Sequence, residues 1–196
     1  MLVFDTRLQI TETGLGVVEY NGYKYKVCKA DVADIKDFYV FVPVKRNVSE
    51  GDCCEVKLCS LTNFTPEDST QGTLALRIEV FDKINPEEYV PLDEFTVKVN
   101  GAVVRTERST VRYIGPTRAP LLQATIRVFN ENRKVFNILL VGYCSTVKLL
   151  DSIENEKYIN CTGVIKLQHK NRRNKQKYQL NIRYFEYVKK GGDNNG

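Results

Sequence analysis

The densest group of residues that could do chemistry is a run of cations between two strand-like segments. From Lys166 to Lys177 the chain has six Lys or Arg, one His and no carboxylate: Lys166, His169, Lys170, Arg172, Arg173, Lys175 and Lys177. Such groups neutralise phosphates and release counterions, which gives an affinity that is independent of base sequence and falls with salt. Because a hairpin turn has no need of mutually repelling cations, the loop indicates contact with a polyanion, with a solvated hairpin tip as the alternative.

Aromatic side chains are interleaved with cations in the neighbouring segments. One segment contains Arg127, Phe129, Arg133, Lys134 and Phe136, and the other contains Lys177, Tyr178, Arg183 and Tyr184. Aromatic faces hold unpaired bases at roughly 1–3 kcal/mol each. The pattern therefore predicts a surface for single-stranded nucleic acid. Aromatic residues on strands more often pack in a core, so that alternative stays open for each ring.

Other chemistries find little support in the sequence. His169 is the only histidine of the chain. The six cysteines form no CxxC pair; they are Cys28, Cys53, Cys54, Cys59, Cys144 and Cys161. Zinc sites need closely spaced ligands, and a nucleophile needs a base that a histidine among cations does not supply. We expect the cysteines to be small buried hydrophobes. We also expect no cofactor, no metal and no enzymatic activity.

Charge divides the chain into two halves. Residues 1–94 carry 10 Lys/Arg and 17 Asp/Glu, a net −7, and residues 95–196 carry 19 and 7, a net +12. Such asymmetry indicates that a part that binds a polyanion lies beside a part that does not. We predict an acidic β-rich module over 1–94, a basic domain over 95–188 and a flexible tail over 189–196. The boundary is the Pro-containing segment 85–94.

Alternating patterns predict strands throughout. In the first half they cover 16–29, with a hairpin turn at Asn21-Gly22, and then 37–44, 52–61 and 73–84. Residues 61–72 are interpreted as an acidic surface loop, and residues 30–37 as a possible helical turn.

The second half has a more specific order. A strand over 95–107 is interrupted at Gly101, residues 109–120 are loop-like, and 121–143 form a long hairpin. Apolar spacing predicts a short helix over 145–153, and a closing hairpin follows over 158–168 and 177–188. Three strands, a helix and two strands are the order of the oligonucleotide/oligosaccharide-binding (OB) barrel.

Four short motifs in this half resemble bacterial and phage single-stranded-DNA-binding proteins and the related primosomal replication proteins. They are Val99-Asn100-Gly101, Leu139 to Gly142, Gly163-Val164-Ile165 and the aromatic Tyr178. The resemblance covers about 95–188. It implies an OB fold over these residues. The β-rich first half has no counterpart in the simple members of the family, and a second, degenerate barrel is one interpretation of it. The resemblance also implies sequence-independent binding of single-stranded DNA in replication, recombination or repair.

The chain departs from that family at the residues that stack bases. The family uses Trp, which is absent here, and the aromatic residues near the corresponding positions are Phe129, Phe136 and Tyr143, with Lys170 at a fourth. This departure favours a plasmid, phage or otherwise specialised bacterial relative.

The expected partners follow from these interpretations. They are single-stranded DNA, with RNA as an alternative, further copies of the chain, and a replication protein that binds the acidic module. No apolar run approaches the roughly 20 residues that cross a bilayer, and we expect a cytoplasmic protein without membrane contact. The alternative function is an OB-fold adaptor or assembly protein whose main contacts are to proteins.

Overall fold

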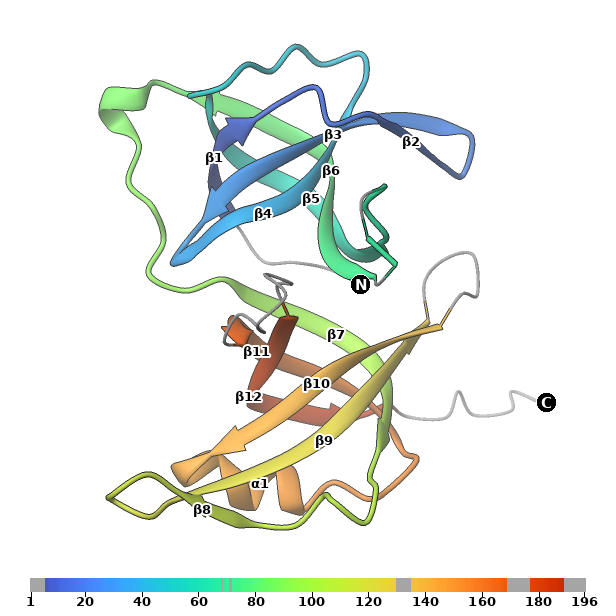
Figure 1. Ribbon diagram of the computed structural model, residues 1–196, viewed down its shortest axis with the longest axis vertical. Coiled ribbons are helices and arrows are strands. Elements are labelled where there is room, and N and C mark those ends of the chain that lie inside the picture. The colour runs from blue at the N-terminus through green and yellow to red at the C-terminus, as the bar shows by residue number, and fades with distance from the viewer. Residues whose placement is uncertain (1–5, 68, 71, 130–134, 169–176, 189–196) are drawn as a thin grey trace, which may run out of the picture. The chain divides into compact units, whose positions relative to one another are not determined.

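The computed structural model describes residues 6–67, 69–70, 72–129, 135–168 and 177–188, and this part of the chain is mainly β-structure (Figure 1). Its elements are β1 (Thr6–Glu12), β2 (Val17–Tyr20), β3 (Tyr23–Val32), β4 (Ile35–Pro43), β5 (Cys53–Phe64), β6 (Thr73–Ile84), the 3-10 helix η1 (Pro86–Glu88), β7 (Thr96–Val104), β8 (Arg112–Ile114), β9 (Ala119–Phe129), β10 (Val135–Tyr143), the 3-10 helix η2 (Cys144–Thr146), α1 (Val147–Asp151), β11 (Tyr158–Gln168) and β12 (Lys177–Tyr187). The predicted fold class is confirmed.

The first six strands close into a barrel of OB topology. Their order is β1-β5-β6-β4-β3-β2, and β1 also pairs with β3. If β2 is left out, the five remaining strands can be counted in chain order as the first (β1) to the fifth (β6). Around the barrel they follow the order first, second, third, fifth, fourth and then the first again. The third and fifth strands, β4 and β6, pair in parallel. Residues 44–52, between β4 and β5, form turns instead of a helix. The second OB-like module that the sequence suggested is therefore present, without the usual helix.

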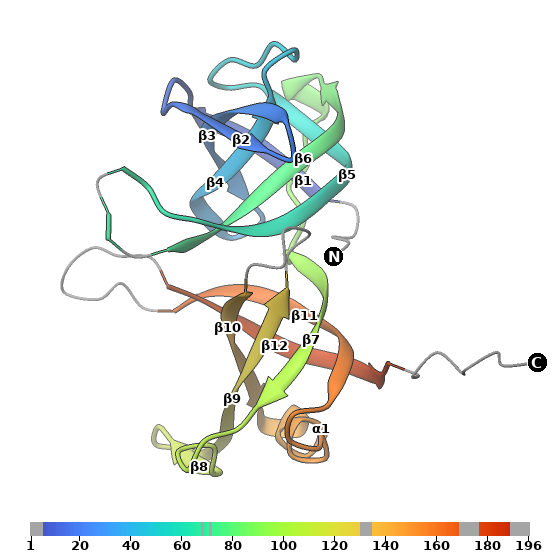
Figure 2. The ribbon, with the colours of Figure 1, turned by 90° about the vertical axis from the view of Figure 1, so that its right-hand side faces the viewer.

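The last six strands repeat this order. The sheet runs β10-β12-β11-β7-β9-β8, and β9 also pairs with β10. If β8 is left out, the ring is again first, second, third, fifth and fourth strand. Here α1 follows the third strand, as the sequence predicted, and it lies at the same end of the barrel as β8 (Figures 1 and 2).

The compact units of the chain cut across the long β11–β12 hairpin. Residues 1–97 and 164–179 form one unit, and residues 98–163 and 180–196 form the other. The part of the hairpin nearest its tip thus belongs with the first barrel. The functional boundary between residues 94 and 95 stays a prediction.

Alternation along the strands separates a filled interior from an outer face. From Leu122 onward the buried residues of β9 alternate as Leu122, Ala124, Ile126 and Val128, and across the ladder Ile126 faces the buried Ile138. The first barrel is filled in the same way, and Cys28, Val40 and Leu76 are fully buried.

Two glycines of the family-like motifs lie where strands approach closely. A Cβ at Gly101 would come within 2.4 Å of the carbonyl oxygen of Arg127, and one at Gly163 within 2.5 Å of that of Asn181. Real Cβ atoms do not approach backbone oxygen this closely, so only glycine fits without moving a strand. The motif glycines therefore have a packing reason.

Some local expectations are corrected by the structure. Residues 6–12 and 112–114 form the strands β1 and β8, and β5 continues to Phe64, which shortens the acidic loop. Residues 30–37 contain no helical turn: they are the ends of β3 and β4, which pair as far as Val32 and Ile35 and are joined by a turn with Ala33 at φ 52°. In the described ranges no helix is long and apolar enough to cross a membrane.

Candidate nucleic-acid interface

The outer face of the β9–β10 ladder carries the part of the predicted site that is exposed. Arg127 lies opposite Asn137, and Phe129 lies opposite Val135. All four side chains are exposed, and Phe129 keeps 46% of its surface open. A cation and an aromatic ring two residues apart on one strand point to the same side of the sheet. This face can therefore offer a phosphate contact next to a stacking surface.

Phe136 lies on the opposite side of the same ladder. It is paired with the buried Val128, and only 6% of its side chain is exposed. Its ring fills the barrel, so its face is not available to a base. The structure corrects the assignment of Phe136 to the binding surface, and the reason is the alternation of β10.

Tyr178 is also part of the core. It is 7% exposed, and its ring packs edge-on against Phe38 with the centroids 4.9 Å apart. Burial raises the pKa of its hydroxyl above the usual range. The aromatic that opens the closing strand therefore anchors β12 inside its unit, and its assignment as a stacking residue is corrected as well.

Three more predicted residues have different surroundings. Tyr143 is 46% exposed at the end of β10, and Lys177 is exposed at the start of β12. The ammonium group of Lys166 lies 2.7 Å from the Asp34 carboxylate, in the turn between β3 and β4. The acidic module thus already supplies a counter-charge to the first cation of the basic loop.

The remaining predicted residues lie outside the described residues. They are Arg133 and Lys134 between β9 and β10, and His169, Lys170, Arg172, Arg173 and Lys175 between β11 and β12. Their part in binding stays a prediction.

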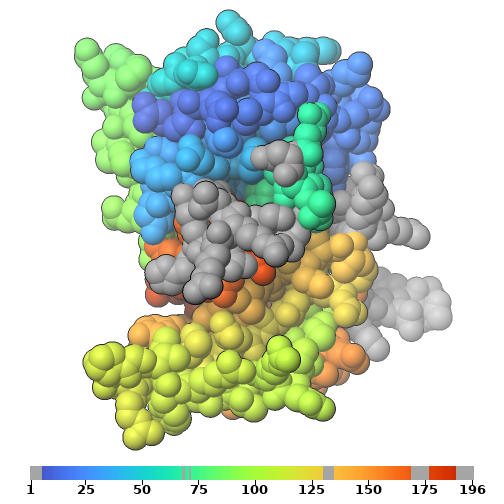
Figure 3. All heavy atoms as spheres, in the orientation of Figure 1, coloured from blue at the N-terminus to red at the C-terminus, as the bar shows by residue number. Residues whose placement is uncertain are grey.

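The β8–β9 hairpin adds cations that the sequence analysis treated only as loop. Arg108, Arg112 and Arg118 are exposed, as is Tyr113 at 63%, and the guanidinium of Arg118 lies over the Tyr113 ring at 5.7 Å. Figure 3 shows the yellow-green atoms of this segment standing out at the surface. The sequence feature that could have identified this segment as a binding surface is its charge, because residues 105–118 contain four arginines and one glutamate.

The corresponding face of the first barrel is covered by its own chain. Tyr25, Val27 and Phe41 form a buried cluster on the side of β3 and β4 opposite to Cys28 and Val40. Side chains that pack against this cluster include Leu15, Val18, Tyr20 and Phe64. The segment that contains β2 therefore closes a face that is open in the second barrel.

Five of the six cysteines lie in the core. All cysteines except Cys144 are buried, and desolvation raises the pKa of Cys54, Cys59 and Cys161 to about 12. The prediction of buried cysteines is confirmed for these five residues and is wrong for Cys144, which is exposed. Within the described ranges no three His, Cys, Asp or Glu residues lie together as metal ligands would.

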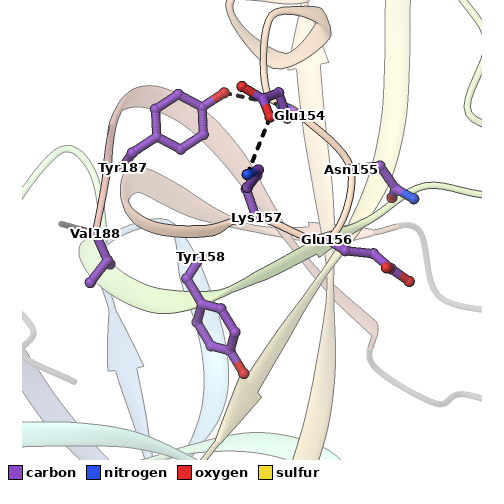
Figure 4. Close-up of a pocket in the computed structure, with 7 residues that line it drawn as sticks. All are labelled: Glu154, Asn155, Glu156, Lys157, Tyr158, Tyr187 and Val188. Carbon is purple, nitrogen blue, oxygen red and sulfur yellow. Dashed lines mark hydrogen bonds and ion pairs between the residues drawn. The ribbon is translucent and has the colours of Figure 1, made fainter. Parts of the chain in front are cut away.

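A cleft of about 740 Å³ opens where β11 begins and β12 ends (Figure 4). The Tyr187 hydroxyl accepts a hydrogen bond from the Glu154 backbone N–H at 3.1 Å, and Glu154 pairs with Lys157 at 3.5 Å. Glu156 also lines this cleft. With two carboxylates against one ammonium, the cleft does not favour a phosphate.

Comparison with known proteins supports the fold over the full length. No family model matches the sequence, and no curated protein matches it. The chain is similar to the crystal structure of the wild-type single-stranded DNA binding protein from Thermus aquaticus, with TM-score 0.60 and 13% identity, covering 99% of this chain and 97% of that one. A deletion variant of that protein gives TM-score 0.61 at 10% identity, covering 100% and 99%. The protein PriB from Ralstonia solanacearum gives TM-score 0.38 at 19% identity over 47% of this chain and 95% of its own.

The Thermus aquaticus matches span both barrels. They confirm that the chain has the fold of a single-stranded DNA binding protein, with two OB-like barrels in one polypeptide. The sequence resemblance reached only residues 95–188, because the motifs that carried it occur in the second barrel.

Proposed function

We propose that the protein binds single-stranded DNA without sequence preference, through the outer face of its second barrel. The observation that carries this proposal is the contrast between two equivalent faces. On β9 and β10 the cation Arg127 and the ring of Phe129 are exposed, whereas on β3 and β4 the same face is covered by the segment around β2. The full-length likeness to a single-stranded DNA binding protein supports it.

The chemistry of this face suits a flexible strand. Arginine and lysine neutralise phosphates irrespective of base, and exposed aromatic rings accept any unstacked base. The β8–β9 hairpin, with Arg112 and Arg118, extends the positive surface beside the ladder, and Tyr143 adds a ring at the end of β10. Contact with the backbone and with base faces is the mode we propose.

The wider role belongs to the same proposal. We place the protein in the cytoplasm, in replication, recombination or repair, as a homo-oligomer that binds DNA and does not catalyse a reaction. The acidic first module, with its net −7, would contact a basic replication partner, because like charge repels phosphate.

The deciding experiment is the salt dependence of binding to a labelled oligothymidine, measured by fluorescence anisotropy. We expect log K to fall linearly with log salt. Each lost phosphate contact should flatten the slope by about 0.7 for a single strand. Arg127→Ala and Arg112→Ala should each do so, whereas Lys45→Ala, an exposed cation of the first barrel, should not. Oligoadenylate and mixed sequences should bind about equally, and oligouridylate tests RNA.

A protein-binding adaptor is the second candidate, and the net −7 of the first module favours it. If the parent chain fails to bind oligothymidine at low salt, the DNA proposal is lost and the adaptor takes its place.

A further inference from the structure

Phe129 and Tyr158 form a pair of nearly parallel rings on the outside of the second barrel. Phe129 ends β9 and Tyr158 begins β11, and β7 lies between these strands in the sheet. The ring centroids are 6.2 Å apart and the planes differ by 23°. Each side chain keeps 46% of its surface exposed. We call this pair the aromatic platform.

The platform is bordered by polar groups. The Asn100 side chain on β7 donates a hydrogen bond to the Asn160 Oδ1 at 2.9 Å, and Asn160 donates to the Glu186 carboxylate at 3.2 Å. In Figure 4 the Tyr158 ring is turned away from the Glu154–Lys157 ion pair. Two half-exposed, stacked rings edged by amides differ from the enclosed apolar pocket that an anchoring protein side chain fills.

We infer that the aromatic platform stacks an unpaired base, and that the bound strand therefore continues from the β9–β10 face across β7 to β11. This inference rests on the proposed function and extends its site to a strand of the barrel that the sequence did not assign to binding. Arg127 lies on the same outward side of β9 as Phe129 and can hold the phosphate next to that base. Stacking on a ring does not depend on the identity of the base.

The carboxylates near Tyr158 refine the inference. Glu154 and Glu156 line the cleft beside this residue, so the base contacts the ring while the phosphate backbone stays on the Arg127 side. Loss of Tyr158 should then lower affinity without changing the salt slope, whereas loss of Arg127 should change the slope.

The loss of affinity has an expected size. An OB fold covers about 4–16 nucleotides, so an oligothymidine of about 15 nucleotides covers the whole face. The two ring centroids are 6.2 Å apart, so a strand that reaches Phe129 also reaches Tyr158. Tyr158→Ala should therefore weaken the binding of this oligothymidine by about 5- to 150-fold, the range for one stacked base.

The test uses the full chain and the fact that it contains no Trp. In Tyr158→Trp the indole is the sole tryptophan, and we expect oligothymidine to quench its fluorescence with the same midpoint as the anisotropy titration. Tyr23→Ala, at a 71% exposed tyrosine of the first barrel, is the matched control and should bind like the parent. Thermal melts of all variants separate loss of binding from loss of fold.

The outcomes are distinct. Quenching of the indole together with a loss of affinity in Tyr158→Ala supports the platform. If the parent binds but Tyr158→Ala binds oligothymidine as tightly as the parent, or saturating DNA leaves the indole unquenched, the platform only ties β9 to β11. The inference is then overturned while the proposed function stands. If the parent does not bind, both proposals fail.

Discussion

Phe129 and Phe136 provide the sharpest test of how the second barrel divides packing from binding. Both are phenylalanines on one hairpin, and the sequence assigned both to the site. In the structure Phe136 is 6% exposed and Phe129 46%. Truncation of Phe136 should therefore lower the stability of the protein, and truncation of Phe129 should lower its affinity for DNA.

The magnitudes differ enough to be measured. Removing a buried phenylalanine ring costs about 3–5 kcal/mol through lost burial and the cavity left behind. At about 2–4 °C per kcal/mol for a chain of this size, the melting temperature of Phe136→Ala should fall by roughly 6–20 °C. Phe129→Ala loses half-exposed area and one ring pair, about 1 kcal/mol of stability. Its affinity for oligothymidine should fall by about 1–3 kcal/mol.

The assay pairs thermal denaturation with anisotropy titrations on the same samples, well below the melting temperature of each variant. Phe136→Leu keeps the barrel largely filled and should bind like the parent. If folded Phe136→Leu lost affinity as strongly as Phe129→Ala, the separation of the two faces of β10 would be refuted. A Phe129→Ala variant that melted as low as Phe136→Ala would refute it equally.

Four further expectations can be checked on single variants. Asp34→Asn removes the partner of Lys166 at 2.7 Å; stability should change by less than about 1 kcal/mol because the pair is largely exposed, but DNA affinity and salt slope should both increase, and an unchanged slope would mean that Lys166 does not contact phosphate. Gly163→Ala should lower the melting temperature because its Cβ would meet the Asn181 carbonyl at 2.5 Å; a melt like that of the parent would show that the strands can separate at no cost. Lys83 and the Ser49 backbone N–H hold the pKa of Asp52 below its ordinary value. The stabilisation from the Asp52 carboxylate is therefore present above its pKa in the unfolded chain and is lost as the pH falls through its pKa in the folded protein. The free energy of unfolding should fall less steeply toward acid pH in Asp52→Asn, and a curve identical to that of the parent would contradict this. One thiol, that of Cys144, should react with a maleimide in the native protein and all six after denaturation, since five are buried; rapid native labelling of more than one would contradict the packing.

The sequence alone contained the architecture of the second half. The order of three strands, a helix and two strands depends on local alternation and on one amphipathic interruption, and both are properties of neighbouring residues. The motif glycines could also be recognised in the sequence. The reason why only glycine fits at Gly101 and Gly163 could not, because a Cβ there would lie within 2.5 Å of a backbone oxygen of a strand distant in the sequence. The strand β8 was missed because its three residues are too few to show an alternating pattern. The strand β1 was missed because its partners, β3 and β5, lie further along the chain.

Which residues face outward was decided by the tertiary structure. Phe129 and Phe136 have similar neighbours in the sequence, yet the register of β9 against β10 turns one to solvent and the other into the barrel. In the same way, Tyr158 meets Phe129 only because β7 brings β9 and β11 into one sheet. Composition and spacing determine that cations and rings are present. The side of the barrel on which each lies depends on strand register, and register is specified by the burial of one face of every strand in the closed barrel.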